Sequence, residues 1–238
     1  MISGIDVSAY NLKIDWQKVA KAGGEFAIVK VTEGTGYINP RAAAQVQGAL
    51  DAGLLVALYH FAQPNGPNWI VDADAEGERL DHLADDFEQQ HGRQFFTFLD
   101  VERNTALTQT ELPFWRSWCD EFRRWCREEG ERRIGWYSGK YFTAALKLEA
   151  SWENTLLWMA QYPIPFRADC SYVDAHGQPL WPDAPLPWAR VDIYQHGGGA
   201  GLGAGGNGAT WPGVDGFSDV NAFAGSRPEL KELISVAA

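Results

Sequence analysis

Cysteine is scarce in this sequence of 238 residues, which contains only three. An odd number of cysteines argues against the paired disulfide framework of small secreted proteins. Cys119 and Cys126 are seven positions apart in a helical pattern, so roughly 10 Å of helical rise separates them, which is beyond the reach of a disulfide. We therefore expect all three cysteines, including Cys170, to be reduced and structural.

Long apolar runs are also missing. No stretch of 18 or more apolar residues occurs, which excludes an ordinary membrane-spanning helix. Residues 1–6 have neither the basic start nor the apolar segment of a secretory signal. We expect a chain that carries no signal peptide and does not insert into membranes.

Basic residues are outnumbered by acidic ones. The chain has 20 Lys and Arg residues against 31 Asp and Glu residues, which gives a formal net charge of −11. A surface with this excess repels the phosphate backbone of nucleic acids and anionic membranes over most of its area. We therefore expect no nucleic-acid partner.

The residues that are present indicate a globular chain. Hydrophobic residues make up 45% of the sequence and charged residues 21%, which is enough to bury a core. Apolar runs that predict strands alternate with helical patterns along most of the chain. The expected strands cover residues 2–7, 26–31, 54–61, 95–101, 134–137, 156–159, 191–195 and 214–220, and the expected helices cover residues 16–22, 40–52, 72–90, 111–129 and 140–146.

This order of elements predicts the fold class. Strands that alternate with helices imply right-handed crossovers and a parallel sheet, and about eight strands in a chain of this length fit a closed barrel. Because the later strands lack full helices between them, we expect an α/β fold, an irregular TIM-like (β/α) barrel with eight strands and about five main helices. Residues 1–225 form a single barrel domain in this prediction, and residues 226–238 form a helical tail packed on or trailing the barrel.

Two segments interrupt the alternation. Residues 164–188 are rich in proline and predict a long ordered loop that packs through aromatic side chains such as Trp181 and Trp188. Residues 197–208 are rich in glycine, and residues 201–206 match the G-x-G-x-x-G pattern of dinucleotide-binding loops. A Trp-Pro-Gly run follows this match where a helix is required, so we reject a phosphate-binding loop here.

The strand at residues 95–102 carries the most informative motif. Side chains alternate faces along a strand, so Asp100 and Glu102 point to the same side as Phe96 and Phe98. Active sites of β/α barrels lie at the carboxyl ends of the strands, and two like charges in a partly desolvated pocket raise the pKa of one of them. One acid and one base can result. A pair of solvated loop carboxylates explains this short motif equally well.

Other polar and aromatic side chains fall near predicted strand ends. A single acidic residue there is usually a helix cap or a solvated group, but Asp6, Glu33 and Asp219 together indicate a shared rim. Aromatic rings in such places either stack on the apolar faces of sugars or pack in the core, and both interpretations stay open. The aromatic residues concerned are Tyr59, Phe61, Tyr137, Trp158 and Tyr194.

Two further motifs indicate different chemistry. His82 and Asp86 lie one helical turn apart and could bind a metal, but no metal-binding spacing supports them and a solvated helix face explains them better. Lys30 could form a Schiff base with a carbonyl substrate, although an ion pair with Glu33 is the simpler interpretation. We predict neither a metal site nor a cofactor.

A series of different short motifs occurs at the successive predicted strand ends. They are Gly-Ile-Asp-Val-Ser at residues 4–8, Val-Lys-Val-Thr-Glu-Gly at 29–34, Tyr-His-Phe at 59–61, Leu-Asp-Val-Glu at 99–102, Gly-Trp-Tyr-Ser at 135–138, Leu-Trp-Met-Ala-Gln-Tyr at 157–162, Tyr-Gln at 194–195 and Gly-Val-Asp-Gly-Phe-Ser-Asp-Val-Asn at 213–221. This series covers nearly the whole chain and resembles the Chalaropsis-type lysozymes of glycoside hydrolase family 25.

The resemblance implies hydrolysis of the β-1,4 bond from N-acetylmuramic acid to N-acetylglucosamine in peptidoglycan. It assigns Glu102 as the general acid, Asp100 as its partner carboxylate, and Asp6 and Asp219 as the other acidic residues of the site. Asp215 competes with Asp219, which the closing Asp-x-Asn pattern favours. Glycoside cleavage needs a proton donor and negative charge near the anomeric carbon, so these assignments fit the chemistry. The stereochemical outcome stays open.

The expected substrate-binding residues lie at the same strand ends. They are Lys30, Glu33, Tyr59, Phe61, Tyr137, Trp158 and Gln195. We expect a monomer whose partner is the peptidoglycan glycan strand, reached on the cell wall after phage lysis, injection or export, and the sequence leaves any immunity or delivery protein open. The alternatives are a non-catalytic barrel that binds cell-wall glycans and a lyase that uses Lys30.

Overall fold

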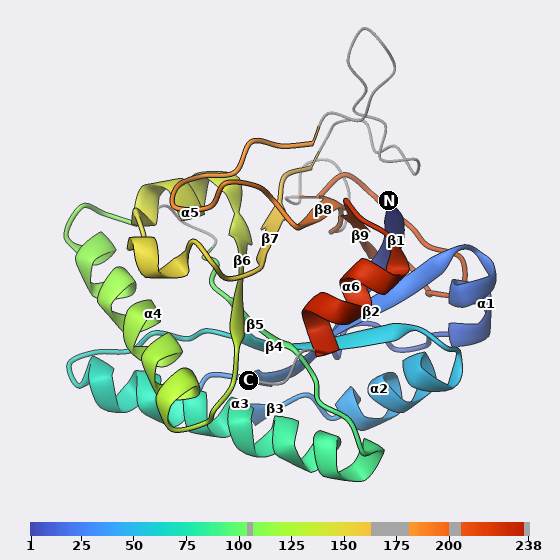
Figure 1. Ribbon diagram of the computed structural model, residues 1–238, viewed down its shortest axis with the longest axis horizontal. Helices are drawn as coiled ribbons and strands as arrows, with labels where there is room; N and C mark the ends of the chain where they lie inside the picture. Colours follow the sequence, from blue (N-terminus) through green and yellow to red (C-terminus); the bar gives the residue numbers. More distant parts are fainter. Residues whose placement is uncertain (104–106, 163–180, 200–205, 236–238) are drawn as a thin grey trace, which may run out of the picture.

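The computed structural model describes residues 1–103, 107–162, 181–199 and 206–235 (Figure 1). The strands are β1 (Ile2–Val7), β2 (Gly24–Glu33), β3 (Tyr37–Ile38), β4 (Leu55–Phe61), β5 (Thr97–Asp100), β6 (Ile134–Gly139), β7 (Leu157–Ala160), β8 (Ile193–Gly197) and β9 (Asp219–Phe223). The helices are α1 (Trp16–Lys21), α2 (Ala42–Asp51), α3 (Trp69–His91), α4 (Glu111–Glu128), α5 (Lys140–Leu146) and α6 (Arg227–Ser235), with a 3-10 turn η1 (Ala150–Trp152).

Eight of these strands close into a barrel. They follow the order β1-β9-β8-β7-β6-β5-β4-β2, and β1 pairs with β2 to complete the ring. The two-residue strand β3, which the sequence did not predict, lies outside the ring and pairs with the end of β2 in antiparallel fashion. The prediction of an irregular α/β barrel with eight strands is confirmed.

The last strand differs from the prediction in position and in direction. The strand predicted at residues 214–220 is wrong, because Val214 forms only an isolated bridge with Ile14 and β9 begins at Asp219. β9 is also antiparallel to both of its neighbours, β1 and β8, so the sheet is not purely parallel. No helix is found in the described part of the chain between β8 and β9, and a parallel pairing would need such a crossover.

The two interrupting segments are only partly described. Most of the proline-rich segment lies outside the described residues, as do Cys170 and all but the last residue of the G-x-G-x-x-G match. In the described part, the indole nitrogens of Trp181 and Trp188 donate hydrogen bonds to the carbonyl oxygens of Val191 at 2.7 Å and Thr155 at 3.1 Å. These two tryptophans therefore attach this part of the segment to the barrel.

The interior of the barrel is an apolar layer in its own right. Large side chains such as Phe26, Phe98 and Trp158 fill it and are at most 2% exposed. Leu230 and Ile234 of α6 belong to the same cluster, together with residues from the beginnings of several strands. Helix α6 therefore closes the amino-terminal end of the barrel, which leaves the opposite end available for a site.

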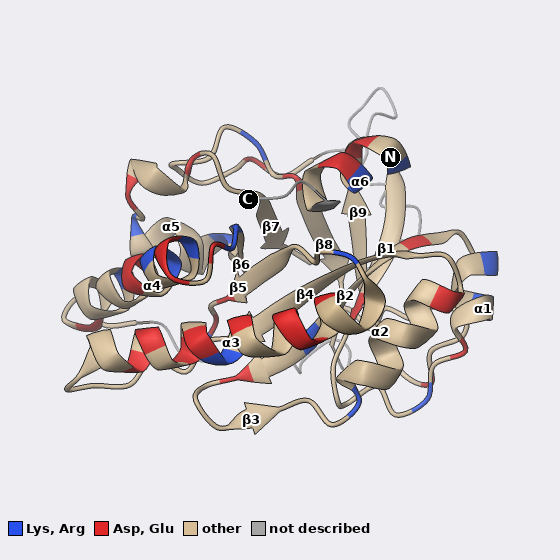
Figure 2. Cartoon of the chain, turned by 60° about the horizontal axis from the view of Figure 1, so that its bottom comes forward, with Lys and Arg blue, Asp and Glu red and all other residues tan. Residues whose placement is uncertain are grey.

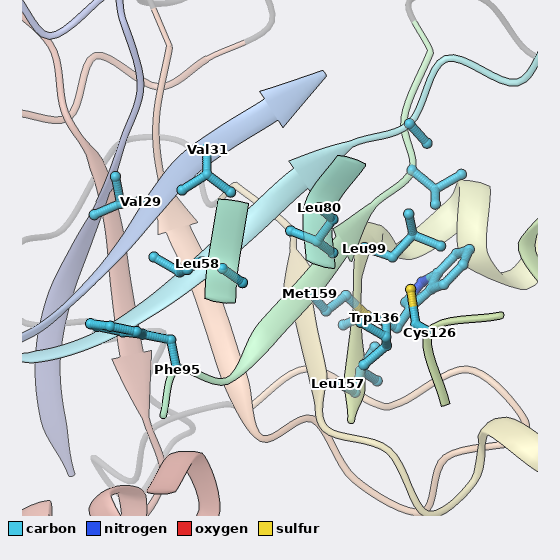
Figure 3. Packing of buried hydrophobic residues seen from close by; sticks show 14 of the residues in the cluster. Val29, Val31, Leu58, Leu80, Phe95, Leu99, Cys126, Trp136, Leu157 and Met159 are labelled. Atoms are coloured by element: carbon cyan, nitrogen blue, oxygen red, sulfur yellow. The ribbon is translucent and has the colours of Figure 1, made fainter. Parts of the chain in front are cut away.

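A second apolar layer lies between the strands and the surrounding helices (Figure 3). Val29, Leu58 and Trp136 point outward from their strands into this layer, and Leu80 of α3 and Cys126 of α4 meet them there. Both described cysteines, Cys126 among them, are buried free thiols. Side chains alternate along each strand between the interior layer and this outer layer. Because both layers are buried, the strands are apolar on both faces.

A buried charge cluster joins α3 to the beginning of β6. Arg132 is 8% exposed, and its guanidinium donates to carboxylate oxygens of Asp81 at 2.9 Å, Asp85 at 2.7 Å and Glu88 at 2.6 Å. The three acidic residues share one face of α3, and red segments along this helix in Figure 2 mark its Asp and Glu residues. The cluster therefore fixes the helix against the sheet at the end of the barrel near α6.

We expect Arg132→Met to lower the free energy of unfolding by about 3 kcal/mol, because it leaves the largely buried carboxylates of Asp81 and Glu88 without their cation. Arg124→Met is the matched control, since its guanidinium contacts Glu121 and Glu128 but is 38% exposed. The control should cost less than about 1 kcal/mol. Urea denaturation measures both, and equal losses would contradict a special role for the buried cluster.

Candidate active site

The carboxyl ends of the parallel strands meet at one rim of the barrel. Because β9 runs the other way, its first residue lies at this same rim, and Asp219 pairs directly with Asp6 of β1. The structure thereby brings Asp6, Asp100, Glu102 and Asp219 together around one cavity of about 180 Å³. The other residues that line this cavity are Tyr59, Tyr137, Trp158, Tyr162, Gln195 and Gly199.

Asp6 is the most firmly held of the four acidic residues. It is 5% exposed, and its Oδ2 accepts hydrogen bonds from the side-chain amides of Gln195 at 2.8 Å and Asn221 at 2.7 Å. Burial, followed by the charge of Asp219, raises the pKa of Asp6 well above its usual range, and the two amide donors only partly offset this. The carboxyl group is therefore fixed in place, in surroundings that favour its protonated form.

Asp100 has a different environment. It is 3% exposed, and within the described residues its Oδ1 atom has no hydrogen-bond partner. Burial, followed by the charge of Glu102, raises its pKa well above the usual range, while the charge of Lys30 acts in the opposite direction. A buried carboxylate oxygen without a donor is costly, so this atom is set to receive a group from a bound molecule.

Glu102 lies just beyond the end of β5, at the mouth of the cavity. Its side chain reaches solvent, yet the surrounding protein desolvates its carboxyl group. This desolvation, together with the charge of Asp219, raises the pKa of Glu102 to about 6, against the opposing effect of Lys30. A carboxylic acid that keeps its proton up to this pH and has access to solvent has the properties of a general acid.

Asp219 is half-buried on the opposite wall. Its Oδ1 accepts a hydrogen bond from the backbone nitrogen of Gly199 at 3.2 Å, and desolvation raises its pKa to about 6. A Cβ atom at Gly198 would collide with the same carboxylate oxygen, so only glycine fits there. Asp215, the competing candidate, is exposed and does not line the cavity.

A network of polar side chains holds the floor of the cavity. Gln195 accepts hydrogen bonds from the hydroxyl groups of Tyr137, at 2.8 Å, and Tyr162. The indole nitrogen of Trp158 donates to Asn221 at 2.7 Å, and Asn221 in turn donates to Asp6. The network is continuous, and it orients Asp6 from two sides.

Tyr162 and Asn221 are functional candidates that the sequence analysis did not single out. A signal was available for Asn221, because it follows Asp219 by two positions on the same strand and therefore shares its face. Tyr162 follows the end of β7, where only its place in a matching motif marked it. The orientation of its hydroxyl group depends on packing that the sequence does not show.

The predicted aromatic residues form the floor and the edge of this site. Tyr59, Tyr137 and Trp158 are less than 10% exposed and pack on one another, with ring centroids 5.8 Å apart for Tyr59 and Trp158 and 4.1 Å apart for Tyr137 and Trp158. Phe61 lines a neighbouring hollow instead. Tyr194 is buried, and its hydroxyl donates to a backbone carbonyl.

A larger hollow of about 680 Å³ adjoins the acidic cavity. Glu102 lines both, so the two spaces meet at this carboxyl group. Its lining combines apolar and polar side chains, a composition suited to sugar rings. The residues that line the larger hollow are Phe61, Ala62, Gln63, Pro64, Glu102, Arg103, Glu111, Phe114 and Trp115.

Lys30 and Glu33 line neither space. Lys30 is 9% exposed, and its ammonium group lies 2.6 Å from a carboxylate oxygen of Glu33. Schiff-base chemistry requires contact between the lysine nitrogen and a carbonyl substrate, and Lys30 borders neither space in which a substrate could bind. The ion pair predicted from the sequence is therefore present, and the lyase alternative loses its support.

Among the described residues, no group of three or more His, Cys, Asp and Glu side chains is arranged to hold a metal ion. His82 is 71% exposed and lies 3.9 Å from Glu78, on the solvated face of α3. No helix among the described elements has the length and apolar character needed to cross a bilayer.

Comparison with known proteins identifies the family. The sequence model described as glycosyl hydrolases family 25 matches residues 5–198. Lysozyme M1 of Streptomyces globisporus is 28% identical over 240 aligned positions, which cover 98% of this chain and 71% of that protein. The N,O-diacetylmuramidase of a Chalaropsis species is 36% identical over 76 positions, 31% of this chain and 36% of that protein.

A solved structure shares the fold. The bacterial lysozyme of Streptomyces coelicolor superimposes with a TM-score of 0.73 at 24% identity, with 100% of this chain and 98% of that chain covered. This likeness shows the barrel, and the family model, which matches residues 5–198, shows the family. The chain belongs to glycosyl hydrolases family 25 and is a glycoside hydrolase of the lysozyme class.

Proposed function

We propose that this enzyme is a muramidase, which hydrolyses the β-1,4 bond between N-acetylmuramic acid and N-acetylglucosamine in the peptidoglycan of cell walls. The observation that carries the proposal is the pairing of Glu102, whose pKa is raised to about 6, with the buried and unpartnered Oδ1 of Asp100 in one rim cavity. The names of the lysozyme and muramidase relatives support the choice of substrate.

Glu102 acts as the general acid in this proposal. Its carboxyl group gives a proton to the glycosidic oxygen as the bond to the anomeric carbon breaks, and positive charge develops on the sugar ring. Asp100 stabilises this oxocarbenium-like state in its ionised form, which desolvation and the charge of Glu102 disfavour and the charge of Lys30 favours. Water then adds to the anomeric carbon and returns a proton to the site, so that each product sugar ends with a hydroxyl group.

Asp6 and Asp219 complete the acidic set. Both carboxyl groups have raised pKa values, chiefly because they are desolvated, so each keeps its proton to a higher pH than an ordinary aspartate does. The glycan strand extends from the acidic cavity into the larger hollow, where Phe61 and Phe114 provide apolar walls. Tyr137, Trp158 and Gln195 support the bound sugar from the floor of the acidic cavity.

Glu102→Gln should reduce the release of new reducing ends from purified peptidoglycan by at least about 100-fold, because glutamine cannot donate a proton to the leaving oxygen. Glu78→Gln, an exposed carboxylate of α3, is the matched control and should retain wild-type activity. Normal digestion by Glu102→Gln would show that another residue is the acid. Binding of peptidoglycan by the wild type without any release of reducing ends would favour the non-catalytic glycan-binding barrel.

The same substitution should change how stability depends on pH. In the folded protein the pKa of Glu102 lies near 6, above its ordinary value near 4.5, so the folded state binds more protons than the unfolded state between these values. Its contribution to stability is therefore lost as the pH rises through about 6. In urea denaturation, Glu102→Gln should become more stable relative to the wild type between pH 5 and pH 7, whereas a constant difference would contradict the raised pKa.

Asp219 and Asp215 provide a paired test of the fourth acidic residue. Asp219→Asn removes a charge that lines the acidic cavity, and we expect a loss of activity of about tenfold or more. Asp215→Asn changes an exposed residue four positions away and should leave the rate within about twofold of the wild type. Both rates are measured from reducing ends released at pH 5, and the reverse order of losses would move the assignment to Asp215.

A further inference from the structure

A β-bulge in β2 places two charged residues beside the acidic cavity. Lys30 pairs with Tyr59 of β4, but the next pairing joins Thr32 to His60, so one residue of β2 is left over between them. Side chains three positions apart on a regular strand point to opposite faces. The bulge turns the two side chains to the same face, where the ammonium group of Lys30 lies 2.6 Å from a carboxylate oxygen of Glu33. Bulges are enriched next to active sites.

The lysine is held on several sides. Its Nζ atom lies 4.4 Å from the centre of the Phe61 ring and 5.8 Å from that of Tyr37, and both positions favour a cation. Its partner Glu33 also accepts a hydrogen bond from the side-chain amide of Gln63 at 3.1 Å. The ammonium group therefore has a fixed position, although its charge touches neither of the two hollows of the rim.

This fixed charge is close to the reacting carboxylates. Phe61, whose ring covers the ammonium group, is the direct partner of Asp100 in the pairing of β4 with β5. The charge of Lys30 lowers the pKa of both Asp100 and Glu102, and the charge of Glu33 raises the pKa of Asp100. The two members of the ion pair thus act on Asp100 in opposite directions.

Other groups face the same carboxylates and must be considered with the pair. They are Asp6 of β1, Tyr59 of β4, Tyr137 of β6, Tyr162 after β7, Asp219 of β9 and, on the side of the larger hollow, Arg103 and Glu111. The charge of Asp6 opposes ionisation of Asp100, the charge of Asp219 opposes that of Glu102, and Arg103 is held by Glu111 at 2.6 Å. Lys30 is therefore the cation that offsets the crowded acids, as far as the described residues show.

We propose that Lys30 and Glu33 form an electrostatic positioning pair, which sets the pH range in which the Asp100 and Glu102 pair holds one proton and is active. Neither residue contacts the reacting atoms in this proposal, which rests on the muramidase function proposed above. An ordinary structural ion pair gives the same effect whichever partner is removed. In this proposal the effect on the pH profile depends on whether the cation or the anion remains.

The test compares Lys30→Met with Glu33→Gln. Both substitutions break the same ion pair, so a purely structural role predicts the same change for both. If charge is what matters, Lys30→Met should move both limbs of the pH profile of kcat/KM upward by roughly half a unit to one unit, because it removes a cation. Glu33→Gln should move the acid limb downward, because Lys30 remains and an anion is lost.

Two controls and one rescue variant complete the experiment. Lys18→Met and Asp15→Asn break an ion pair with the same i,i+3 spacing at 3.0 Å on the exposed surface of α1, and they should leave the profile unchanged. Lys30→Arg keeps the charge and should return both limbs toward their wild-type positions. Glu33→Gln alone tests the proposal if Lys30→Met does not fold, because the side chain of Glu33 is 33% exposed.

The outcomes separate this inference from the proposed function. Opposite shifts of the two variants support the electrostatic pair. Shifts in the same direction, or a raised KM with unmoved limbs, would overturn it in favour of a structural or a substrate-binding role. Failure of the wild-type enzyme to release reducing ends from peptidoglycan would instead overturn the muramidase proposal itself.

Discussion

Four carboxyl groups crowded into one partly dry space are the constraint on which this structure depends. Desolvation is the main cause that raises the pKa of each group, so the folded protein disfavours the ionised form of all four. The remainder of the rim compensates for this. Amide donors hold Asp6, a backbone nitrogen holds Asp219, and one buried ammonium group lies nearby.

The barrel supports this arrangement because its apolar core layers and its acidic cavity occupy different regions. One apolar layer fills the interior and a second lies beneath the helices, so the strands are fixed on both faces. Helix α6 closes one end, and the acids occupy the other. Because the site residues stand on strand ends or within two residues of them, their positions follow from the sheet rather than from long loops.

Much of the fold and part of the site were accessible from the sequence, for physical reasons. Alternating strands and helices predicted the barrel, and the two-residue spacing predicted that Asp100 and Glu102 share a side. The reversal of β9 was not accessible, because the strand pattern has no direction and the crossover rule assumes a helix that is absent from the described connection. Asp219 was nevertheless predicted at the correct rim. The first residue of an antiparallel strand lies at the same end of the barrel as the last residue of a parallel strand.

The ion pair of Lys30 and Glu33 was predicted from the sequence, but the extra residue that makes it possible was not. Regular alternation puts Lys30 and Glu33 on opposite faces of β2, and only the register of the neighbouring strand reveals the bulge that unites them. Similarly, the role of Gly198 is visible only once Asp219 is seen against it. Close approaches between distant segments are set by packing, which local patterns do not encode.

The direct pairing of the first strand with the last has a consequence for biosynthesis. The hydrogen bond from Asn221 to Asp6 joins positions 215 residues apart, so the ring cannot close until β9 has been made. A polypeptide that is still on the ribosome and lacks β9 also lacks one wall of the acidic cavity. Translation through residue 223 therefore precedes both closure of the barrel and completion of the cavity.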